Sequence, residues 1–297
     1  MTERLQGAPV AETIDRATRE ALREGGERGT PPCLASIHRG LEGPFRLYLN
    51  RQRRAAETLG IRFREETLAP SEGPAGLRAR ARSLDGDPSV HAVLVEHPLP
   101  TRYEFQSAVD ELRPTKDVDG VGTKNLGQLV GGRPEHAPAV ALAALAIARH
   151  YHLPLDGAPV AIIGRSGTVG LPLALLLAQR SPGPNATVTV AHTGTRDLAR
   201  ALAGARTVFS CAGAPNLLNR SVVPKEAAVI DIGLSTLPDP SRATGVRIVG
   251  DADLESLDGW ASSVTPVPGG VGPVTVAELM RSTVRSWQAQ PGGGPAP

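Results

Sequence analysis

Short apolar runs alternate with longer stretches of helical periodicity along most of the chain. In the first half, runs rich in branched apolar residues predict strands, and apolar residues spaced three and four apart predict helices. The predicted strands cover residues 32–37, 61–63 and 90–95, and the predicted helices cover residues 11–23, 44–59 and 76–84. This alternation predicts an α/β protein.

The second half repeats this rhythm after an alanine-rich helix at residues 139–151 and a proline at 154. Strands are predicted at residues 160–163, 186–191, 207–210, 227–232, 247–249 and 261–264, and a helix between the second and third of them is predicted to run through Arg206. Such regular alternation of strand and helix is typical of a doubly wound parallel sheet. The length of 297 residues is enough for two domains.

A glycine-rich turn joins strand 160–163 to the next helix. Gly164, Gly167 and Gly170 recur every three residues, and the helical stretch begins immediately after them. Glycines allow a backbone to approach a pyrophosphate, whose charge the N–H groups of a helix N-terminus stabilise. The turn therefore predicts a dinucleotide site, although a tight turn that binds nothing has the same sequence pattern.

The tip of strand 186–191 favours NADP over NAD. An acidic side chain usually holds the ribose hydroxyl of NAD at this place, whereas the phosphate of NADP needs cations or hydrogen-bond donors. Residues 192–196, at the tip of this strand, include Thr193 and Thr195 but no acidic residue, and Arg165 lies in the glycine-rich turn. These three side chains fit the phosphate of NADP.

Two polar features stand out in the first half. Helix 44–59 has an inward stripe at Phe45, Tyr48, Gln52, Ala55 and Leu59, with arginines on its outer face that we interpret as solvated. From this helix alone, Gln52 fits a hydrogen-bonded core glutamine. Strand 90–95 ends in Glu96 and His97, at the edge where open α/β sheets place their ligands.

Composition excludes several classes of function. A net charge of +2 and only 3% aromatic residues argue against nucleic-acid binding. The absence of a long apolar span or leader predicts a cytoplasmic protein that does not contact a membrane. Cys33 and Cys211 lie in apolar runs and are interpreted as buried reduced thiols. Asp117 and Asp119 lack the acidic ladder of a calcium loop, so no metal is expected.

Three motifs together carry a resemblance to a known family. They are Gly164-Arg-Ser-Gly-Thr-Val-Gly-Leu-Pro172, Lys116-Asp-Val-Asp-Gly120 and Thr265-Pro-Val-Pro-Gly-Gly-Val-Gly-Pro-Val-Thr275. In this order and spacing they resemble the bifunctional methylenetetrahydrofolate dehydrogenase/methenyltetrahydrofolate cyclohydrolase family. The resemblance runs from about Pro32 to Val284.

The resemblance implies a fold and an assembly. It implies an N-terminal α/β folate-binding domain, a C-terminal Rossmann-type doubly wound parallel sheet that binds NADP, a cleft between them, and a homodimer. The expected bounds are 1–140 for the folate domain, with a helix at 275–290 packing back on it, 141–274 for the NADP domain, and 291–297 for a disordered tail.

The resemblance also implies roles for individual residues. Asp119 is expected to hold the pterin ring of tetrahydrofolate one-carbon derivatives, and Tyr48 to orient the folate near Gln52. The remaining expected folate contacts are Val95, Glu96, His97, Pro268, Gly269, Gly270, Val271 and Gly272, and the expected cofactor contacts are Gly164, Arg165, Ser166, Thr193 and Leu234.

The chain departs from the family pattern at the expected catalytic positions. The family has Tyr-x-x-x-Lys where this chain has Tyr48 and Gln52, and Val-Gln-Leu-Pro where it has Val95, Glu96 and His97. The family segment Pro-Cys-Thr-Pro is here Glu135-His-Ala-Pro138. Because a neutral amide cannot transfer a proton, the sequence predicts an NADP-dependent methylenetetrahydrofolate dehydrogenase whose cyclohydrolase activity is weak or lost.

Three alternatives remain open from the sequence. A specialised relative in secondary metabolism would act on a modified one-carbon carrier. Cyclohydrolase activity would be retained if Glu96 served as the acid/base group, given a raised pKa. The third alternative is a catalytically inactive protein that binds folate or a nucleotide. The intact glycine-rich turn of the expected cofactor site argues against it.

Overall fold

The protein folds into two units that each contain a parallel sheet. The structure is a computed structural model that describes residues 1–26, 30–97, 99, 101–180, 183–241 and 245–290. Unit 1 comprises Met1–Ala11 and Val140–Thr275, and unit 2 comprises Glu12–Ala139 together with the chain from Val276 onward. The tail predicted to be disordered, 291–297, lies outside the described residues.

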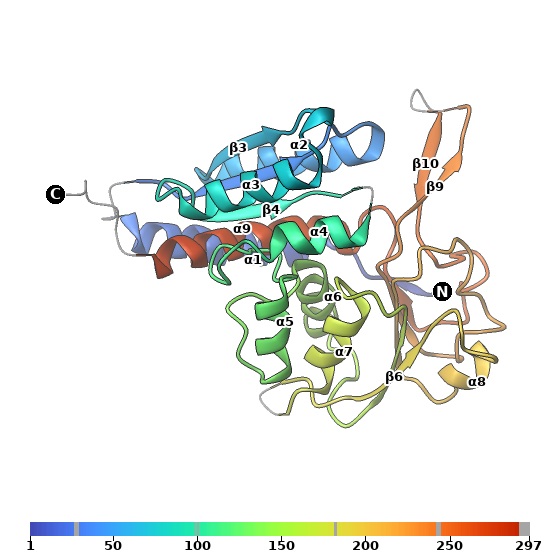
Figure 1. The fold of residues 1–297 in the computed structure, drawn as a ribbon. Helices are drawn as coiled ribbons and strands as arrows, with labels where there is room; N and C mark the ends of the chain where they lie inside the picture. The colour runs from blue at the N-terminus through green and yellow to red at the C-terminus, as the bar shows by residue number, and fades with distance from the viewer. Residues whose placement is uncertain (27–29, 98, 100, 181–182, 242–244, 291–297) are drawn as a thin grey trace. The chain divides into compact units, whose positions relative to one another are not determined.

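Unit 1 is built on a six-stranded sheet in the order β1-β11-β8-β7-β5-β6. Every pairing in it is parallel. The strands are β1 (Glu3–Arg4), β5 (Pro159–Ile163), β6 (Thr187–Ala191), β7 (Thr207–Ser210), β8 (Ala228–Asp231) and β11 (Ser263–Val264), with α6 (Ala139–His150), α7 (Gly170–Ala178) and α8 (Leu198–Leu202) between them along the chain (Figure 1). The predicted Rossmann-type doubly wound sheet is confirmed.

Two features of unit 1 differ from the sequence expectations: the sheet that contains strand 247–249 and the length of the helix before β7. The expected strand at 247–249 lies in β10 (Val246–Val249), which pairs antiparallel with β9 (Ser235–Pro238) in a separate two-stranded sheet. Its apolar residues pair within this hairpin instead of entering the main sheet. The helix expected to run through Arg206 ends at Leu202, because the chain must turn to enter β7 at Thr207.

The first eleven residues belong to unit 1, whereas the sequence analysis assigned them to the folate domain. The physical reason is β1, a strand of two residues that is too short to show any periodicity. Glu3 pairs with Ser263 of β11, and the Thr2 hydroxyl donates to the carbonyl oxygens of Leu257 and Ala261 at 2.9 and 2.8 Å. The chain start therefore forms one edge of the unit 1 sheet.

Unit 2 is built on a three-stranded parallel sheet in the order β3-β2-β4. The strands are β2 (Cys33–His38), β3 (Arg62–Thr67) and β4 (Ala92–Val95), and the helices and the short 3-10 turn are α1 (Ala8–Glu24), α2 (Gly43–Leu59), η2 (Pro70–Glu72), α3 (Gly73–Gly86), α4 (Arg102–Val109), α5 (Thr123–Val130) and α9 (Val271–Ala289). Beyond β4, the chain returns as an isolated parallel bridge between Val93 and Asp117.

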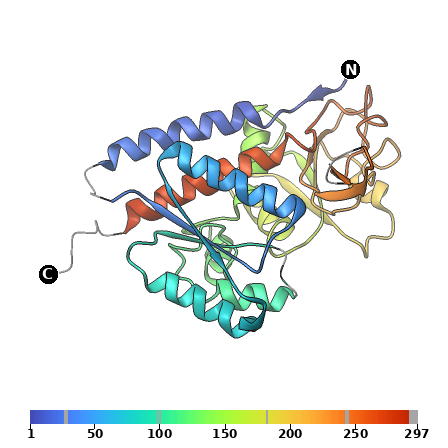
Figure 2. The same ribbon diagram turned by 90° about the horizontal axis from the view of Figure 1, so that it is seen from above.

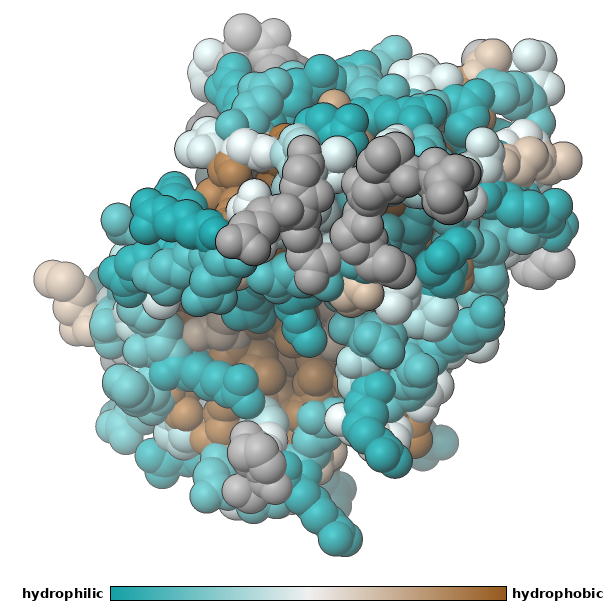
Figure 3. Space-filling model, turned by 90° about the vertical axis from the view of Figure 1, so that its left-hand side faces the viewer, coloured by the Kyte–Doolittle hydropathy of each residue, from teal (hydrophilic) through white to brown (hydrophobic). Residues whose placement is uncertain are grey.

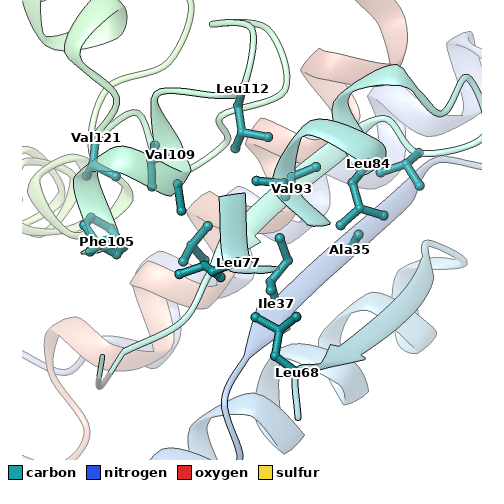
Figure 4. Close-up of a cluster of buried hydrophobic side chains, with 14 of the residues drawn as sticks. Ala35, Ile37, Leu68, Leu77, Leu84, Val93, Phe105, Val109, Leu112 and Val121 are labelled. Atoms are coloured by element: carbon teal, nitrogen blue, oxygen red, sulfur yellow. The ribbon is translucent and has the colours of Figure 1, made fainter. Parts of the chain in front are cut away.

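Alternate residues of the strands enter two separate cores. One face of the sheet, with Ala35, Ile37 and Val93, packs against α3 and α4 through Leu77, Leu84 and Phe105 (Figure 4). The opposite face packs against α1, α2 and α9, and its buried residues include Leu34, Ala56, Leu59, Ala92, Leu94, Leu279 and Met280 (Figure 2). The resulting helix–sheet–helix layering fixes which strand residues can point toward α2.

Only part of the predicted inward stripe of α2 is buried. Gln52 is completely buried and Leu59 nearly so, but the Phe45 side chain is 43% exposed, which contradicts the prediction. Phe45 lies in the first turn of the helix, and Leu49, one turn further on, is the buried apolar residue there.

The arginines on the outer side of α2 are not simply solvated. Arg46 and Arg53 both pair with Glu65 of β3, and Glu65 also contacts His38. Further ion pairs join Arg64 and Arg80 to Glu66. On the face seen in Figure 3, hydrophilic side chains cover most of the surface, and hydrophobic groups show mainly in a recessed area. The prediction of a solvated face thus holds only for part of this helix.

Candidate active site

The strand register places Glu96 beside Ser36. Ser36 pairs with Leu94, and Leu94 and Glu96 are two residues apart, so their side chains point to the same face of the sheet. This is the face that α2 and α9 cover. The Ser36 hydroxyl donates to Glu96 Oε1 at 2.9 Å, and both side chains are buried.

Helix α2 brings Gln52 and Tyr48 to the same place. Ala56 of α2 packs on this face, and Gln52 and Tyr48 lie one and two turns before it on the same side of the helix. Gln52 lies close enough to both the Tyr48 hydroxyl and the Glu96 carboxyl to lower the pKa of each. Yet neither amide atom of Gln52, which is 0% exposed, completes a hydrogen bond with a described residue. A buried amide that completes no hydrogen bond is costly, so Gln52 has hydrogen-bonding capacity left for its two neighbours or for a ligand.

Burial dominates the electrostatics of this cluster. It raises the pKa of Glu96, an effect that the Ser36 hydroxyl and the Gln52 amide partly offset. It also raises the pKa of Tyr48, with the charges of Glu96 and Asp119 adding to the shift. Tyr48 therefore stays a phenol, able to donate, and Glu96 is held closer to neutrality than an exposed glutamate.

The segment carrying Asp119 is anchored on both sides. The Lys116 ammonium, 2% exposed, donates to the carbonyl oxygens of Leu84 and Asp87 at 3.2 and 2.7 Å, at the end of α3. The Asp117 carboxylate accepts from the Gly122 N–H at 2.8 Å and from the Asn125 amide at 2.9 Å. These contacts fix the loop, and they remove Lys116 from any role as an acid/base group.

Among the described residues, a single hydrogen-bond donor contacts the Asp119 carboxyl group. The Ala139 N–H donates to its carboxyl group, but burial, Asp117 and Glu96 together raise the pKa of Asp119 to about 8. In the ligand-free protein at neutral pH, Asp119 is therefore mostly protonated.

Two other predicted folate contacts are turned elsewhere. The Val95 side chain belongs to the core on the opposite face from Glu96, which leaves only its backbone for a ligand. The His97 ring stacks on Phe105 of α4, with the ring centroids 4.2 Å apart. Burial lowers the pKa of His97, so it is neutral at physiological pH.

The segment that departs from the family at residues 135–138 packs inside unit 2. His136 is buried, and its Nε2 lies 2.9 Å from the Ser286 hydroxyl of α9, which itself donates to the Ser282 carbonyl oxygen. The Nε2 atom is therefore the protonated one. Burial lowers the pKa of His136 to about 4, so the imidazole is a neutral structural contact.

The glycine-rich turn in unit 1 is as tight as its sequence suggests. A Cβ on Gly164, whose φ is +114°, would lie 2.6 Å from Cys211 Sγ, and a Cβ on Gly170 would lie 2.2 Å from the Gly164 carbonyl oxygen. The Ser166 hydroxyl accepts from the Val169 and Gly170 N–H groups at 3.1 and 3.4 Å. The strand, turn and helix N-terminus thus pack directly on one another.

The other predicted cofactor residues are at the surface of unit 1. Arg165, Ser166 and Thr193 are exposed, and Leu234, just beyond β8, is 60% exposed. Cys211 is a free, partly exposed thiol in this region, whereas the free thiol of Cys33 is buried as predicted. These side chains are accessible to a ligand, as a cofactor site requires.

The loop at residues 265–272 also belongs to unit 1, whereas Tyr48 and its neighbours belong to unit 2. It contains a cis bond between Val267 and Pro268. The Gly7 N–H donates to the Gly269 carbonyl oxygen at 2.8 Å, and a Cβ on Gly7 would lie 1.9 Å from the Gly270 carbonyl oxygen. The N-terminal segment therefore holds this loop, while Val271 and Gly272 open α9.

Ser36 is the site residue that sequence reasoning missed. The sequence does contain a pattern that could have indicated it. Ser36 and His38 are polar residues in an apolar run, and because they are two residues apart, they lie on the same face of a strand. Its contact with Glu96 depends on the β2–β4 register, which periodicity does not reveal.

Two further searches gave negative results. Among the described residues, no group of three or more histidine, cysteine, aspartate or glutamate side chains could hold a metal ion. Within that same part of the chain, no helix is both long and apolar enough to cross a membrane.

Fold and site together define a class: a two-unit α/β protein that combines a Rossmann-type sheet with an acid–amide cluster. Comparison with known families makes this specific. Residues 5–119 match the family model described as "Tetrahydrofolate dehydrogenase/cyclohydrolase, catalytic domain". Residues 138–291 match the model described as "Tetrahydrofolate dehydrogenase/cyclohydrolase, NAD(P)-binding domain". The chain belongs to this enzyme family, and the predicted resemblance is confirmed.

Individual relatives are similar in sequence to this protein along nearly the whole chain. The bifunctional protein FolD 2 of Haloarcula marismortui is 33% identical over 98% of each chain, and the FolD of a Bradyrhizobium species is 35% identical over 96% of each. Among solved structures, a methylenetetrahydrofolate dehydrogenase from the silkworm Bombyx mori is 30% identical over 97% of this chain and 99% of its own, with a TM-score of 0.89.

A second solved structure comes from Trypanosoma brucei. This methylenetetrahydrofolate dehydrogenase-cyclohydrolase, in complex with NADP and an inhibitor, is 33% identical over 97% of each chain, with a TM-score of 0.89. The likeness covers both units.

Proposed function

We propose that the protein is an NADP-dependent methylenetetrahydrofolate dehydrogenase with weak or absent cyclohydrolase activity. It oxidises 5,10-methylenetetrahydrofolate to 5,10-methenyltetrahydrofolate. The observation that carries the proposal is Gln52, a completely buried amide without a partner that lies between Tyr48 and Glu96. Its position is that of the family lysine in the Tyr-x-x-x-Lys motif.

Hydride transfer suits this set of residues. Bound NADP would supply the hydride acceptor. The chain's own contribution is to bind and orient the folate, and orientation alone accounts for a large part of such a barrier. Asp119 would bind the paired N–H donors of the pterin ring, and the Tyr48 phenol and the Gln52 amide would fix the one-carbon bridge by hydrogen bonds.

Hydrolysis of the methenyl group makes a different demand. Water must add to the amidinium carbon while a proton is moved, which calls for an acid/base group. Gln52 cannot supply one. The chain has three lysines. Lys116 is committed to the end of α3, and Lys124 on α5 and Lys225 in the Pro224–Ala227 turn of unit 1 are exposed. This supports a loss of the second activity.

The NADP site would be formed by residues of unit 1. The tight turn leaves the Arg165 guanidinium exposed, and among the described residues Arg165 has no ion pair. The tip of β6 presents Thr193, also exposed. A cation and a hydroxyl suit the additional phosphate of NADP, while Gly164, Ser166 and Leu234 would contact the rest of the cofactor. The residues Pro268–Gly272 would contribute to binding the folate.

A second candidate function rests on Glu96. Because burial raises its pKa, Glu96 is a weaker acid than an exposed glutamate and could serve as the acid/base group that retains cyclohydrolase activity. Ser36 would then hold the base in position.

Parallel assays on the purified protein distinguish these functions. NADPH formation on adding methylenetetrahydrofolate tests the dehydrogenase, and the decay of methenyltetrahydrofolate absorbance tests the cyclohydrolase. We expect NADPH to form and the absorbance to decay no faster than without protein. Rapid decay that Glu96→Gln abolishes would establish Glu96 as the base. Absence of NADPH formation would refute the dehydrogenase.

The expectation of a cytoplasmic homodimer also stays a prediction. Size-exclusion chromatography with light scattering would measure the mass, and a monomer would contradict it.

A further inference from the structure

Glu96 is a buried acid that has no ion pair with any described residue. The polar groups around it are the Ser36 hydroxyl, the Gln52 amide, the Tyr48 phenol and the Asp119 carboxyl. Among the described residues, no arginine or lysine forms an ion pair with Glu96, although ion pairs are frequent elsewhere in unit 2. A buried carboxyl group is expensive unless it is paired or protonated. The described part of the chain therefore supplies no cation that would ionise it.

The geometry keeps this acid in one orientation. Glu96 is 7% exposed, and its Oε1 is fixed by the Ser36 hydroxyl at 2.9 Å. The Gln52 amide lies next to the same carboxyl group and has unused hydrogen-bonding capacity. Glu96 and Gln52 thus form a pre-oriented pair, one potentially negative and one neutral, both ready for a ligand.

We propose that Glu96 is the counter-ion of a positively charged one-carbon group on the folate. The protein would then bind the cationic methenyl form more tightly than neutral folates. This inference rests on the proposed function for the identity of the ligand, and it adds a catalytic role for Glu96 that the family's neutral glutamine at this position cannot perform.

The charge balance of the reaction favours such a counter-ion. A C–H bond of the methylene bridge breaks, and the hydrogen leaves with both electrons to the nicotinamide of NADP, which is the oxidant. The positive charge passes from the pyridinium ring to the N5–C–N10 amidinium, and no proton is released. A carboxylate beside the amidinium stabilises this charge as it develops.

The same contact accounts for a slow second step. A carboxylate that stabilises the amidinium lowers the energy of the cation relative to the neutral adduct that water would form. Glu96 would therefore retain the methenyl product rather than hydrolyse it.

The test is equilibrium binding without NADP. The purified protein and its Glu96→Gln variant are mixed rapidly with methenyltetrahydrofolate, the cation, and with tetrahydrofolate, a neutral probe, and the dissociation constants are compared. We expect Glu96→Gln to lose about tenfold or more in affinity for the cation, with tetrahydrofolate changed by less than about threefold. Glu57→Gln, a change of an exposed glutamate of α2, is the matched control and should alter neither.

Ser36 provides a second, independent variant. Ser36→Ala frees Glu96 Oε1 and should lose part of the same selectivity, and Ser36→Thr, which keeps the hydroxyl, should restore it. Equal losses for both ligands, or no loss in Glu96→Gln, would overturn the inference. If wild-type protein shows the selectivity but forms no NADPH, the proposed dehydrogenase is wrong while the charge recognition stands.

Discussion

Each unit contains a pair of neighbouring acids, Asp231 and Asp251 in unit 1 and Glu96 and Asp119 in unit 2, but the two pairs are held differently. In unit 1, Asp251 accepts from the Ser210 hydroxyl at 2.6 Å and from the Ala212 and Ala214 N–H groups at 2.9 and 2.7 Å. Asp231 accepts from the N–H groups of Gly233 and Ala252 at 2.9 and 2.8 Å, and also from that of Asp251. In unit 2, Glu96 has one hydroxyl donor, and Asp119 has one N–H donor.

The difference separates acids that hold the fold from acids that await a ligand. The unit 1 pair is filled with internal donors and leaves no room beside it, since a Cβ on Gly233 would lie 2.2 Å from Asp251 and one on Gly250 would lie 2.1 Å from Asp231. The unit 2 pair retains unused acceptors beside the unpartnered Gln52 amide. The two pairs therefore differ in the number of hydrogen-bond donors that surround each acid.

The largest expected effect is on the stability contributed by the unit 1 pair, Asp231 and Asp251. Asp251→Asn exchanges one acceptor oxygen for an N–H group that faces existing donors, so we expect a loss of about 2–4 kcal/mol in the free energy of unfolding. Denaturant unfolding followed by circular dichroism would measure it. A variant as stable as wild type would mean that the donors of the cluster do not distinguish the two kinds of acid.

The second prediction converts the open pair. A lysine introduced by Gln52→Lys would meet Glu96, whose opposite charge raises the pKa of the lysine and holds it protonated, so the single change should do little. The double change Gln52→Lys with Glu96→Gln removes that charge and should speed the decay of methenyltetrahydrofolate absorbance by about 100-fold. If the single change alone gives the full rate, Glu96 is not ionised beside position 52.

A third prediction concerns an unpaired cation in unit 1. Arg165→Ala should weaken NADP binding by about 10- to 100-fold and NAD binding far less, because it removes a charge-assisted partner of the additional phosphate. Fluorescence titration with each dinucleotide gives both constants. Arg200→Ala, at an exposed arginine of α8, serves as the control. Equal losses for NADP and NAD would remove Arg165 from the phosphate site.

The smallest effect is expected for Asp119→Asn, and its sign is opposite to that of Asp251→Asn. The pKa of Asp119 is raised from 3.8 to about 8 in the folded protein, so the fold loses stability as pH rises through that window. The amide cannot ionise and still accepts from the Ala139 N–H. We expect a gain on the order of 1 kcal/mol at pH 8 that disappears near pH 4. Thermal unfolding across this range measures it, and a pH-independent difference would contradict the shift.

Local sequence revealed the parts of the fold that depend on short-range pattern. The strand, turn and helix around Gly164 and the parallel sheet of unit 1 follow from periodicity and glycine spacing. The two-residue strand β1 and the pairing of β10 with β9 were not predictable, because each depends on a partner elsewhere in the chain.

The members of the cluster were named from motif positions, but their contacts were not predictable. Tyr48, Gln52, Glu96 and Asp119 came from motif positions, and the structure brings them together within unit 2. Ser36 was missed, and the turning of Val95 into the core was not foreseen, since both depend on strand register. The protonated state of Asp119 arises from burial and from neighbouring acids, which a sequence does not show.

The division of the chain between the units has a consequence for biosynthesis. The chain starts in unit 1, passes to unit 2 within α1, returns within α6 and passes to unit 2 again within α9. On the ribosome, β1 must wait for β11, and the core over Leu34 and Leu94 must wait for Leu279 and Met280 of α9. Neither unit can therefore finish folding until nearly the whole chain has been synthesised, and a truncated translation product would expose both unfinished cores to the quality-control machinery.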